Sequence, residues 1–310
     1  MSYRVFARKY RPQTFAEVVG QDHITRTLQN AVTSKRLAQA YLFVGPRGIG
    51  KTSTARILAK ALNCKEGISA EPCGKCDSCL EIAEGRSLDV IEIDGASNNG
   101  VENIRDLRES AAYAPASGEF KIYLIDEVHM LSASAFNAFL KTLEEPPKHA
   151  IFILATTEKH KIIPTILSRC QIFDFQRIRV KDIADHLTQI ATKEAVSADP
   201  EALHQIALKA DGALRDALSI FDQLVTFAGS TLTYQNVLDN LHILDYEYYF
   251  KITDAAEKED ISAALLILND IYEKGFDGHH FVVGLSEHVR NLLVCKDPKT
   301  ATLLEAPDTI

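Results

Sequence analysis

The stretch AYLFVGPRGIGKT, from Ala40 to Thr52, decides the fold. Its last eight residues fit the pattern G-x-x-x-x-G-K-[ST], and they stand between an apolar run and a helical pattern. Glycines in such a loop let backbone N–H groups wrap around a phosphate chain, and the N-terminus of the next helix adds the positive end of its dipole. The stretch therefore predicts a phosphate-binding P-loop in an α/β domain.

Two side chains at the end of this loop carry its chemistry. Lys51 supplies a mobile positive charge for the β and γ phosphates, and Thr52 supplies a hydroxyl for Mg²⁺. We expect nucleotide contacts from the loop and the first residues of its helix, namely Gly45, Pro46, Arg47, Gly48, Ile49, Gly50, Lys51, Thr52 and Ser53.

The first half of the chain alternates short apolar runs with helical patterns. The runs are rich in Ile, Val and Phe and continuous, as strands covered on both faces are: Ala40–Gly45, Leu88–Asp94, Phe120–Glu127 and Ala150–Thr157. Strand–helix repetition of this kind predicts a right-handed parallel sheet with helices on both faces.

The run IYLIDE ends in two carboxylates, Asp126 and Glu127. In a P-loop protein the first would hold Mg²⁺, and the second would orient and polarise the water that attacks the γ-phosphate. The pair therefore predicts an ATP-hydrolysing site. The guanine-reading sequence N-K-x-D does not occur, so guanine specificity has no support.

The composition is typical of a globular protein with more than one domain. The chain has 310 residues, of which 46% are apolar and 25% charged. No apolar run is long enough to span a membrane, and none follows the basic N-terminus as in a secretory signal, so we expect a cytoplasmic protein. Because the net charge is −8, any DNA contact is expected to be local or shared with other subunits.

From about Arg177 onward the sequence reads as helix. In ADPEALHQIALKADG we expect Asp199 as the N-cap, Pro200 at the first helical position and Gly212 after the end. Later helical patterns form a third unit, and its last residues stop without an obvious structural ending. We therefore expect this third unit to be cut short.

Four of the six cysteines follow the P-loop helix at the spacing C-x8-C-x2-C-x2-C, in a segment at 62–82. Four thiolates at short spacing in a reducing compartment suit a closed, structural Zn²⁺ site. A segment of this size cannot bury a hydrophobic core, and the metal supplies the folding energy instead. Two other interpretations compete with zinc. One is a redox pair, which would leave two of the cysteines unused, and the other is an iron–sulfur cluster. We expect a zinc module that acts as a surface knuckle for assembly, with the ligands Cys64, Cys73, Cys76 and Cys79. Of the remaining two, Cys170 belongs to the S-R-C sequence at 168–170, and Cys295 reads as a buried apolar residue.

Several further motifs, together with the P-loop and the Asp-Glu pair, resemble one family. They are ARKYRPQTFAEVVGQ at 7–21, LATT at 154–157, TILSRC at 165–170 and GALRDAL at 212–218. With them the chain resembles the AAA+ ATPases, and specifically the gamma/tau family of bacterial clamp loaders, to at least residue 240.

The resemblance implies three domains. The first, at 1–177, is an α/β P-loop AAA+ domain with the inserted zinc module. An all-α lid domain at 178–243 follows, and then a partial all-α collar domain at 244–310.

The resemblance also implies roles for single residues near the nucleotide. Arg11, Pro12 and Val19 come to lie near the adenine and ribose. Thr157 becomes the sensor 1 residue that faces the γ-phosphate; strand alternation points only one of two neighbouring threonines that way, and Thr156 is the alternative.

Two arginines gain roles only from their motifs. Arg169 in TILSRC is implied to be an arginine finger, which reaches the ATP of a neighbouring subunit and stabilises charge in the transition state. Arg215 in GALRDAL is implied to be sensor 2, carried on the lid toward the γ-phosphate of its own chain.

The implied activity is ATP hydrolysis that drives clamp loading in replication. The implied partners are the other subunits of a hetero-oligomeric ring, the sliding clamp and primer–template DNA. A polymerase active site is absent from the sequence, so nucleotidyltransferase activity would belong to the holoenzyme. DEVH at 126–129 formally fits a helicase box, but a helicase would need a second set of parallel strands, and the rest of the sequence reads as helix. An AAA+ ATPase of another kind is the remaining alternative.

Overall fold

The computed structural model describes residues 3–241, 244–297 and 299–300. The described residues form two compact units: the first comprises the residues up to His186 together with Ala210–Ile220, and the second comprises Leu187–Lys209 together with the residues from Phe221 onward. No helix within the described residues is both long and apolar enough to cross a lipid bilayer.

The first unit is built on a five-stranded sheet in which every pair of neighbouring strands is parallel. The strands lie in the order β2-β3-β4-β1-β5. Their bounds are β1 Ala40–Val44, β2 Val90–Asp94, β3 Lys121–Asp126, β4 Ala150–Thr156 and β5 Gln171–Asp174. The four strands predicted from apolar runs are present, and the parallel α/β sheet is confirmed.

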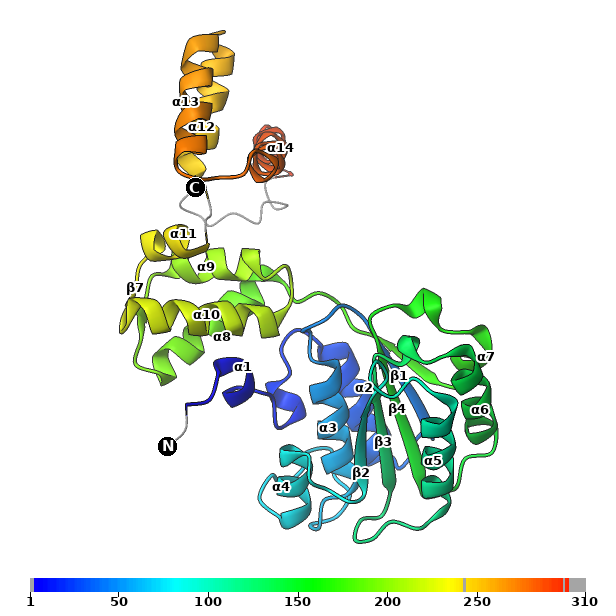
Figure 1. Ribbon diagram of the computed structural model, residues 1–310. Helices are drawn as coiled ribbons and strands as arrows, with labels where there is room; N and C mark the ends of the chain where they lie inside the picture. The colour runs from blue at the N-terminus through cyan, green and yellow to red at the C-terminus, as the bar shows by residue number, and fades with distance from the viewer. Residues whose placement is uncertain (1–2, 242–243, 298, 301–310) are drawn as a thin grey trace. The chain divides into compact units, whose positions relative to one another are not determined.

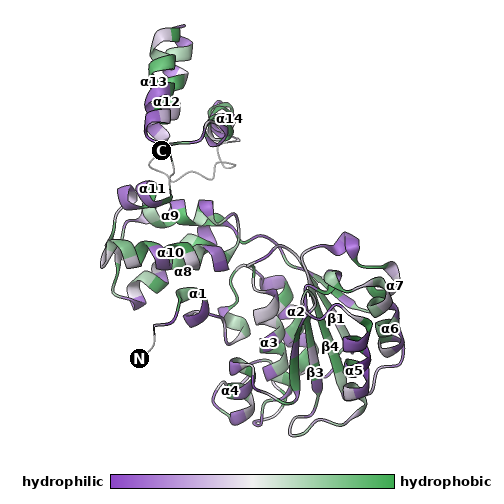
Figure 2. Cartoon of the chain, in the orientation of Figure 1, coloured by the Kyte–Doolittle hydropathy of each residue, from purple (hydrophilic) through white to green (hydrophobic). Residues whose placement is uncertain are grey.

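Helices cover both faces of this sheet (Figure 1), because alternate side chains of a strand point to opposite faces. Tyr41 and Phe43 of β1 pack with α2 and α3, whereas Leu42 and Val44 pack on the other face with α5, α6 and α7. Figure 2 shows hydrophobic residues concentrated in the strands. The helices of this part, with η marking 3-10 helices, are α1 Phe6–Lys9, η1 Phe15–Glu17, α2 Asp22–Thr33, α3 Lys51–Leu62, α4 Asp77–Glu84, α5 Val101–Ala112, η2 Val128–Met130, α6 Ala133–Glu144, η3 Lys159–Lys161 and α7 Pro164–Leu167.

One strand of the sheet is not predicted by the sequence pattern. β5 pairs with β1 at the edge of the sheet. Its two end residues, Gln171 and Asp174, are exposed, and Phe173 is its only buried residue. Four residues with polar ends carry too little apolar pattern to indicate a strand.

Beyond the sheet the described part of the chain is helical, as predicted, apart from two short strands, β6 Ser197–Ala198 and β7 Thr231–Leu232, which pair in parallel. The carboxylate of Asp199, expected to cap the next helix, accepts a hydrogen bond at 3.0 Å from the backbone N–H of Tyr234, at the start of α11. The helices are α8 Val180–Lys193, α9 Pro200–Lys209, α10 Leu214–Ala228, α11 Tyr234–Leu241, α12 Tyr246–Glu257, α13 Ile261–Glu273 and α14 Gly278–Cys295.

The last three helices share a small core around Tyr249, Ile271 and Phe281. The prediction that Cys295 is buried is wrong: it is exposed at the end of α14, beyond the turns that pack on this core. The expected incomplete end of this unit falls on residues 301–310, which lie outside the described residues. The domain boundaries at 177 and 243 stay predictions.

Candidate nucleotide site and metal centre

The P-loop connects β1 to α3, and two of its glycines are required by geometry. Gly45 has a φ of 144°, and a Cβ atom there would lie 2.5 Å from the carbonyl oxygen of Phe175. Gly50 stands directly before α3 with a φ of 103°. Side chains other than hydrogen are strained at such φ values, so the glycines allow the tight turn that places the N-terminus of α3 at the loop.

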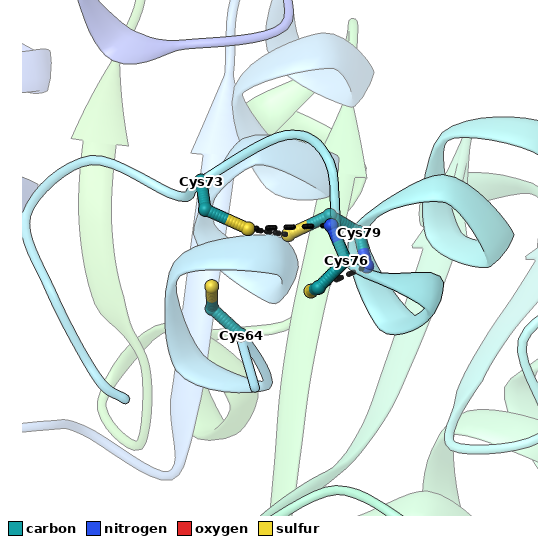
Figure 3. A group of neighbouring side chains, drawn as sticks. All are labelled: Cys64, Cys73, Cys76 and Cys79. Atoms are coloured by element: carbon teal, nitrogen blue, oxygen red, sulfur yellow. Dashed lines mark hydrogen bonds between the residues drawn. The ribbon is translucent and has the colours of Figure 1, made fainter. Parts of the chain in front are cut away.

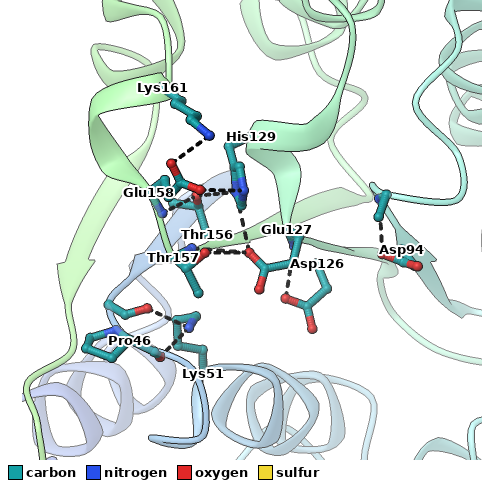
Figure 4. A network of polar contacts seen from close by, with 12 residues as sticks. Pro46, Lys51, Asp94, Asp126, Glu127, His129, Thr156, Thr157, Glu158 and Lys161 are labelled. Atoms are coloured by element: carbon teal, nitrogen blue, oxygen red, sulfur yellow. Dashed lines mark hydrogen bonds and ion pairs between the residues drawn. The ribbon is translucent and has the colours of Figure 1, made fainter. Parts of the chain in front are cut away.

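Lys51 is held inside this loop (Figure 4). Its Nζ donates hydrogen bonds to the carbonyl oxygens of Gly45, at 2.7 Å, and Pro46, at 2.6 Å. Burial lowers the pKa of Lys51, and the negative charges of Glu127 and Asp126 oppose this shift. A buried ammonium group on neutral carbonyls is well placed to exchange them for charged phosphate oxygens, which are stronger acceptors.

The carboxylates at the end of β3 lie directly against the start of α3. The Thr52 hydroxyl donates to Oδ2 of Asp126 at 2.8 Å, and the backbone N–H of Glu127 donates to Oδ1 of Asp126 at 3.0 Å. A hydroxyl and a carboxylate oxygen side by side fit the ligand preference of Mg²⁺. Glu127 itself has a φ of 46°, a backbone conformation that is uncommon outside glycine and clusters at functional sites.

The two threonines at the end of β4 have different partners (Figure 4). Oε2 of Glu127 accepts hydrogen bonds from the hydroxyl of Thr157, at 3.0 Å, and from its backbone N–H, at 3.3 Å. Thr156 is completely buried; its hydroxyl lies 3.0 Å from Nδ1 of His129 and accepts from the backbone N–H of Glu158 at 3.0 Å. The structure therefore brings Thr157, and not Thr156, to the acidic pair.

His129 lies in this network, although the sequence indicated it only as part of the DEVH box. Its Nδ1 is 3.4 Å from Oε2 of Glu127, and its Nε2 is 3.4 Å from Oε1 of Glu158. Glu158 also pairs with Lys161 at 2.7 Å, and this hydrogen bond lowers the pKa of Glu158. The ring thus connects the carboxylate at the end of β3 to the loop that follows β4.

The residues predicted to lie near the adenine differ in their contacts with α3 and the P-loop. Arg11 donates from Nε to Oγ of Ser53 at 3.3 Å, and burial together with the positive charge of Arg56 lowers its pKa. Pro12 is half-buried beside it in the chain.

Val18, the neighbour of the predicted Val19, borders the P-loop, and the role of Val19 near the base stays a prediction. Val18 is buried, and its Cγ1 lies 4.0 Å from the point that a Cβ on Gly50 would occupy. Val19 is only half-buried. The motif at 7–21 contains both valines, so the sequence pattern alone does not indicate which of them lies nearer to the P-loop.

The segment that carries Arg215 also touches the P-loop. The backbone N–H of Arg215 donates to the carbonyl oxygen of Gly48 at 3.1 Å. A Cβ on Gly48 would lie 3.4 Å from Cβ of Arg215, whose side chain is exposed. The backbone contact puts this arginine beside the loop of its own chain.

The structure does not bring Arg169 into this cluster. Its Nη1 donates to the carbonyl oxygen of Thr165 at 2.7 Å, and its Nη2 pairs with Oε1 of Glu144 at 2.7 Å. None of its hydrogen bonds to described residues involves the P-loop or the acidic pair. Arg169 therefore lies apart from the nucleotide site of its own chain.

The four clustered cysteines meet at one point beside α4 (Figure 3). Their sulfur atoms all lie within 4.8 Å of one another, and those of Cys73 and Cys79 are 4.0 Å apart. Zinc–sulfur bonds of about 2.3 Å in a tetrahedron would set the sulfurs about 3.8 Å apart. The arrangement of Cys64, Cys73, Cys76 and Cys79 is therefore compatible with a zinc ion.

Backbone hydrogen bonds also suit thiolates in this cluster. The N–H of Cys76 donates to Sγ of Cys73 at 3.4 Å, and the N–H of Cys79 donates to Sγ of Cys76 at 3.5 Å. Burial alone would raise the pKa of Cys76, but hydrogen bonds from the N–H groups of Cys79 and Lys65 outweigh it and lower the pKa to about 7. The thiolate form of Cys76, which is the form that binds a metal, is thus supported, whereas burial raises the pKa of Cys79.

Known proteins resemble the chain over nearly its whole length. A family model described as DNA polymerase III, delta subunit, matches residues 20–179, and one described as DNA polymerase III clamp loader subunit, ATPase lid domain, matches residues 182–230. The DNA polymerase III subunit tau of Bacillus subtilis is 48% identical over 96% of this chain and 53% of its own length. The subunit gamma of Buchnera aphidicola is 45% identical over 91% of this chain and 78% of its own length. The chain thus spans about half the length of the Bacillus tau subunit.

Solved structures show the same fold at low identity. The Thermotoga maritima RuvB Holliday junction branch migration motor matches with a TM-score of 0.57 and 18% identity, over 81% of this chain and 80% of that chain. At this identity the likeness concerns the AAA+ fold alone.

Proposed function

The chain belongs to the family of DNA polymerase III gamma and tau subunits, and from this premise we propose that it is the ATP-hydrolysing motor subunit of a bacterial clamp loader. The observation that carries the proposal is the meeting of Lys51, Thr52, Asp126, Glu127 and Thr157 at the carboxyl ends of β1, β3 and β4. This is the edge of a parallel sheet at which ligands bind.

Each of these side chains has a part in phosphoryl transfer. Lys51 leaves its carbonyl partners to bind the β and γ phosphates. Thr52 and Asp126 hold Mg²⁺, which when bound neutralises charge that develops on the phosphate oxygens. Glu127 orients and polarises the attacking water, and Thr157 holds that carboxylate through Oε2 so that Oε1 faces the water.

Two arginines complete the site. Arg215 reaches the γ-phosphate of its own chain from its position beside Gly48. Arg169 serves the ATP of a neighbouring subunit, in agreement with its place apart from its own P-loop. Because this arginine finger comes from a neighbouring subunit, an isolated chain should hydrolyse ATP slowly.

The cycle that we propose is a switch driven by ATP. ATP bound between subunits orders the ring, which opens the sliding clamp and grips primer–template DNA. DNA completes the arrangement of Glu127, Thr157, Arg215 and the neighbour's arginine, and hydrolysis then releases the closed clamp. This work takes place in the cytoplasm, and polymerisation itself belongs to other subunits.

Assembly with other subunits is supported by an apolar surface on the last helices. Large hydrophobic side chains of α13 and α14 are exposed in the single chain, to 61% for Leu265, 71% for Leu266 and 62% for Leu293. Exposed apolar side chains gathered on helices are typical of surfaces that bind other proteins. We propose that these helices form the collar of the ring.

The test is steady-state ATP hydrolysis by the full-length protein with its partner subunits, measured with and without clamp and primed DNA. Strong stimulation by clamp and DNA together, lost on Arg169→Ala, is the expected result. Lys51→Ala should abolish nucleotide binding, whereas Arg169→Ala should leave it intact. Turnover that does not respond to clamp would reject the clamp-loader assignment and leave an AAA+ ATPase with another client.

A further inference from the structure

The segment from Arg11 to Phe15 is fastened along the P-loop helix α3. Lys60 of that helix, only 2% exposed, donates from Nζ to the backbone oxygen of Gln13 at 2.6 Å and to its Oε1 at 2.9 Å. The side-chain amide of Gln13 donates in turn to the carbonyl oxygen of Arg11 at 3.0 Å. Together with the bond from Arg11 to Ser53, these contacts fix Arg11 and Gln13 of this segment, which we call the strap, on α3.

The cysteine module supplies the other attachment of this strap. Glu71 stands between Cys64 and Cys73, and its Oε2 accepts from the backbone N–H of Phe15 at 3.2 Å. Its Oε1 accepts from the side-chain amide of Gln29 on α2 at 2.7 Å. One carboxylate thus binds both the strap and the neighbouring helix.

The position of Glu71 depends on the cysteines. Residues 65–76 contain no helix or strand, so their path has no regular backbone ladder to fix it. The sulfur cluster holds both ends of this excursion, and a hydrogen bond from Ser78 to the carbonyl oxygen of Asn63 closes its base at 2.7 Å. The middle of the loop is held as well, by a hydrogen bond from the backbone N–H of Ser69 to the carbonyl oxygen of Ala61 at 3.4 Å and by packing of Ile68 on the core. The cysteines therefore fix the two ends of the loop that carries Glu71, and these contacts fix its middle.

The strap leads to the mouth of the P-loop. Phe15, 2% exposed, belongs to the same core as Val18 and as the residues of α3. Val18 in turn lies next to Gly50. The phosphate-binding atoms belong to the loop itself, which is fixed by β1 and α3 without Glu71. Arg11 and Pro12, which the sequence resemblance implies to lie near the adenine and ribose, belong to the strap, so we take the strap as the wall on which the base and ribose would rest.

We propose that the cysteine module is a positioning element for nucleotide binding, in which Glu71 holds the wall that receives the base and ribose of ATP. This role is different from the surface knuckle for assembly that the sequence predicts. It rests on the proposed ATP site, because the ligand is the nucleotide. Glu71 does not touch the ligand; it acts through Phe15 and the strap.

The experiment compares two ligands by calorimetric titration of the full-length chain in the presence of Mg²⁺. ATP uses both the loop and the wall, whereas inorganic tripolyphosphate uses the loop alone. We expect Glu71→Ala to weaken ATP binding about three- to tenfold, because a charge-assisted hydrogen bond on the strap is lost. Tripolyphosphate should bind the variant within about twofold of the wild type.

The matched control is Glu66→Ala in the same module. Among the residues that the structure describes, Glu66 has one ion pair, with Lys75 at 3.3 Å on the surface of the module, so its loss should leave both affinities unchanged. Glu71→Gln keeps one acceptor for the N–H of Phe15 and should recover most of the ATP affinity. Zinc content, measured on each variant, should remain at the wild-type level.

Three results would overturn the inference. Equal weakening of ATP and tripolyphosphate would make Glu71 a general support of the fold, and unchanged ATP affinity would leave the strap independent of the module. Equal effects of Glu66→Ala and Glu71→Ala would show that charge alone is responsible. If the wild type binds tripolyphosphate but not ATP, or neither, the proposed function fails instead, so the two failures are distinguishable.

Discussion

The hydroxyl of Thr157 donates a hydrogen bond to Oε2 of Glu127 at 3.0 Å, and the backbone N–H of Thr157 donates to the same oxygen at 3.3 Å. The two residues stand 30 positions apart in the chain, at the ends of β4 and β3. Both donors hold Oε2 at the end of β4, where Nδ1 of His129 also lies 3.4 Å away, and in the proposed mechanism Oε1 would face the attacking water. The orientation of the proposed base is therefore set by the adjacent strand.

Replacement of Thr157 by valine tests this relationship. The variant keeps the shape of the side chain and removes the hydroxyl donor, so Glu127 loses the shorter of its two hydrogen bonds to Thr157. We expect kcat for ATP to fall about 10- to 100-fold, because a misplaced general base is inefficient. The Kd for ATP should change by less than about threefold, since the loop and Lys51 are untouched.

The other threonine provides the control. Thr156→Val removes a completely buried hydroxyl that bonds to His129 and Glu158, so its main effect should be a lower free energy of unfolding, by about 1–3 kcal/mol. A selective loss of kcat in Thr156→Val, with Thr157→Val unaffected, would make Thr156 the sensor.

The ion pair between Arg169 and Glu144 should matter little for stability. Both side chains are partly in water, at 32% and 49% exposure, and pairs of that kind contribute less than about 1 kcal/mol. Urea unfolding of Arg169→Ala and Glu144→Gln should therefore give free energies within that range of the wild type. A larger loss in either variant would mean that Arg169 is a structural residue, and its effect on turnover would then say nothing about a finger.

The cysteine cluster should bind one zinc ion per chain and stabilise the first unit. Cys76→Ser removes one of four ligands, and we expect loss of the metal and a decrease of roughly 3–5 kcal/mol in the free energy of unfolding. Metal analysis and chemical denaturation check both results. Cys295→Ser is the matched control, because that thiol is exposed and lies outside the cluster. Equal zinc content in the two variants would contradict a four-cysteine site.

Much of the candidate site could be predicted because parallel strands bring their carboxyl ends to one edge. Asp126 and the P-loop are recognisable in sequence, and the sheet alone places them together. The sequence could not decide between Thr156 and Thr157 as the sensor, since alternation shows that two neighbouring threonines point apart but not which one faces the site.

Contacts between distant segments could not be predicted in the same way. Nothing in the pattern around Glu71 indicates that it accepts a hydrogen bond from Phe15, 56 residues away. Val18 and Val19 are alike in sequence and differ only in burial, and β5 is too short and polar to stand out. Each of these depends on tertiary packing, which local periodicity does not contain.

We expect His288 to make the stability of the last helices depend on pH. Its side chain is 1% exposed, its ring lies 4.8 Å from that of Phe250 and 5.2 Å from that of Tyr246, and its Nδ1 has no hydrogen-bond partner in the described chain. Burial lowers the pKa of His288 in the folded state. The unfolded chain, with a histidine pKa of about 6.5, therefore binds a proton at a pH where the folded chain does not.

The contribution of His288 to stability is consequently complete above about pH 6.5 and decreases as the pH falls below that value. His288→Phe fits the aromatic cluster and cannot titrate, so the free energy of unfolding of this variant should decrease less between pH 7.5 and pH 5.5 than that of the wild type. Urea denaturation followed by circular dichroism measures both slopes. His279→Gln, an exposed histidine of the same helix, should keep the wild-type slope. If His288→Phe and the wild type lose stability in parallel, the buried ring is not the group that titrates.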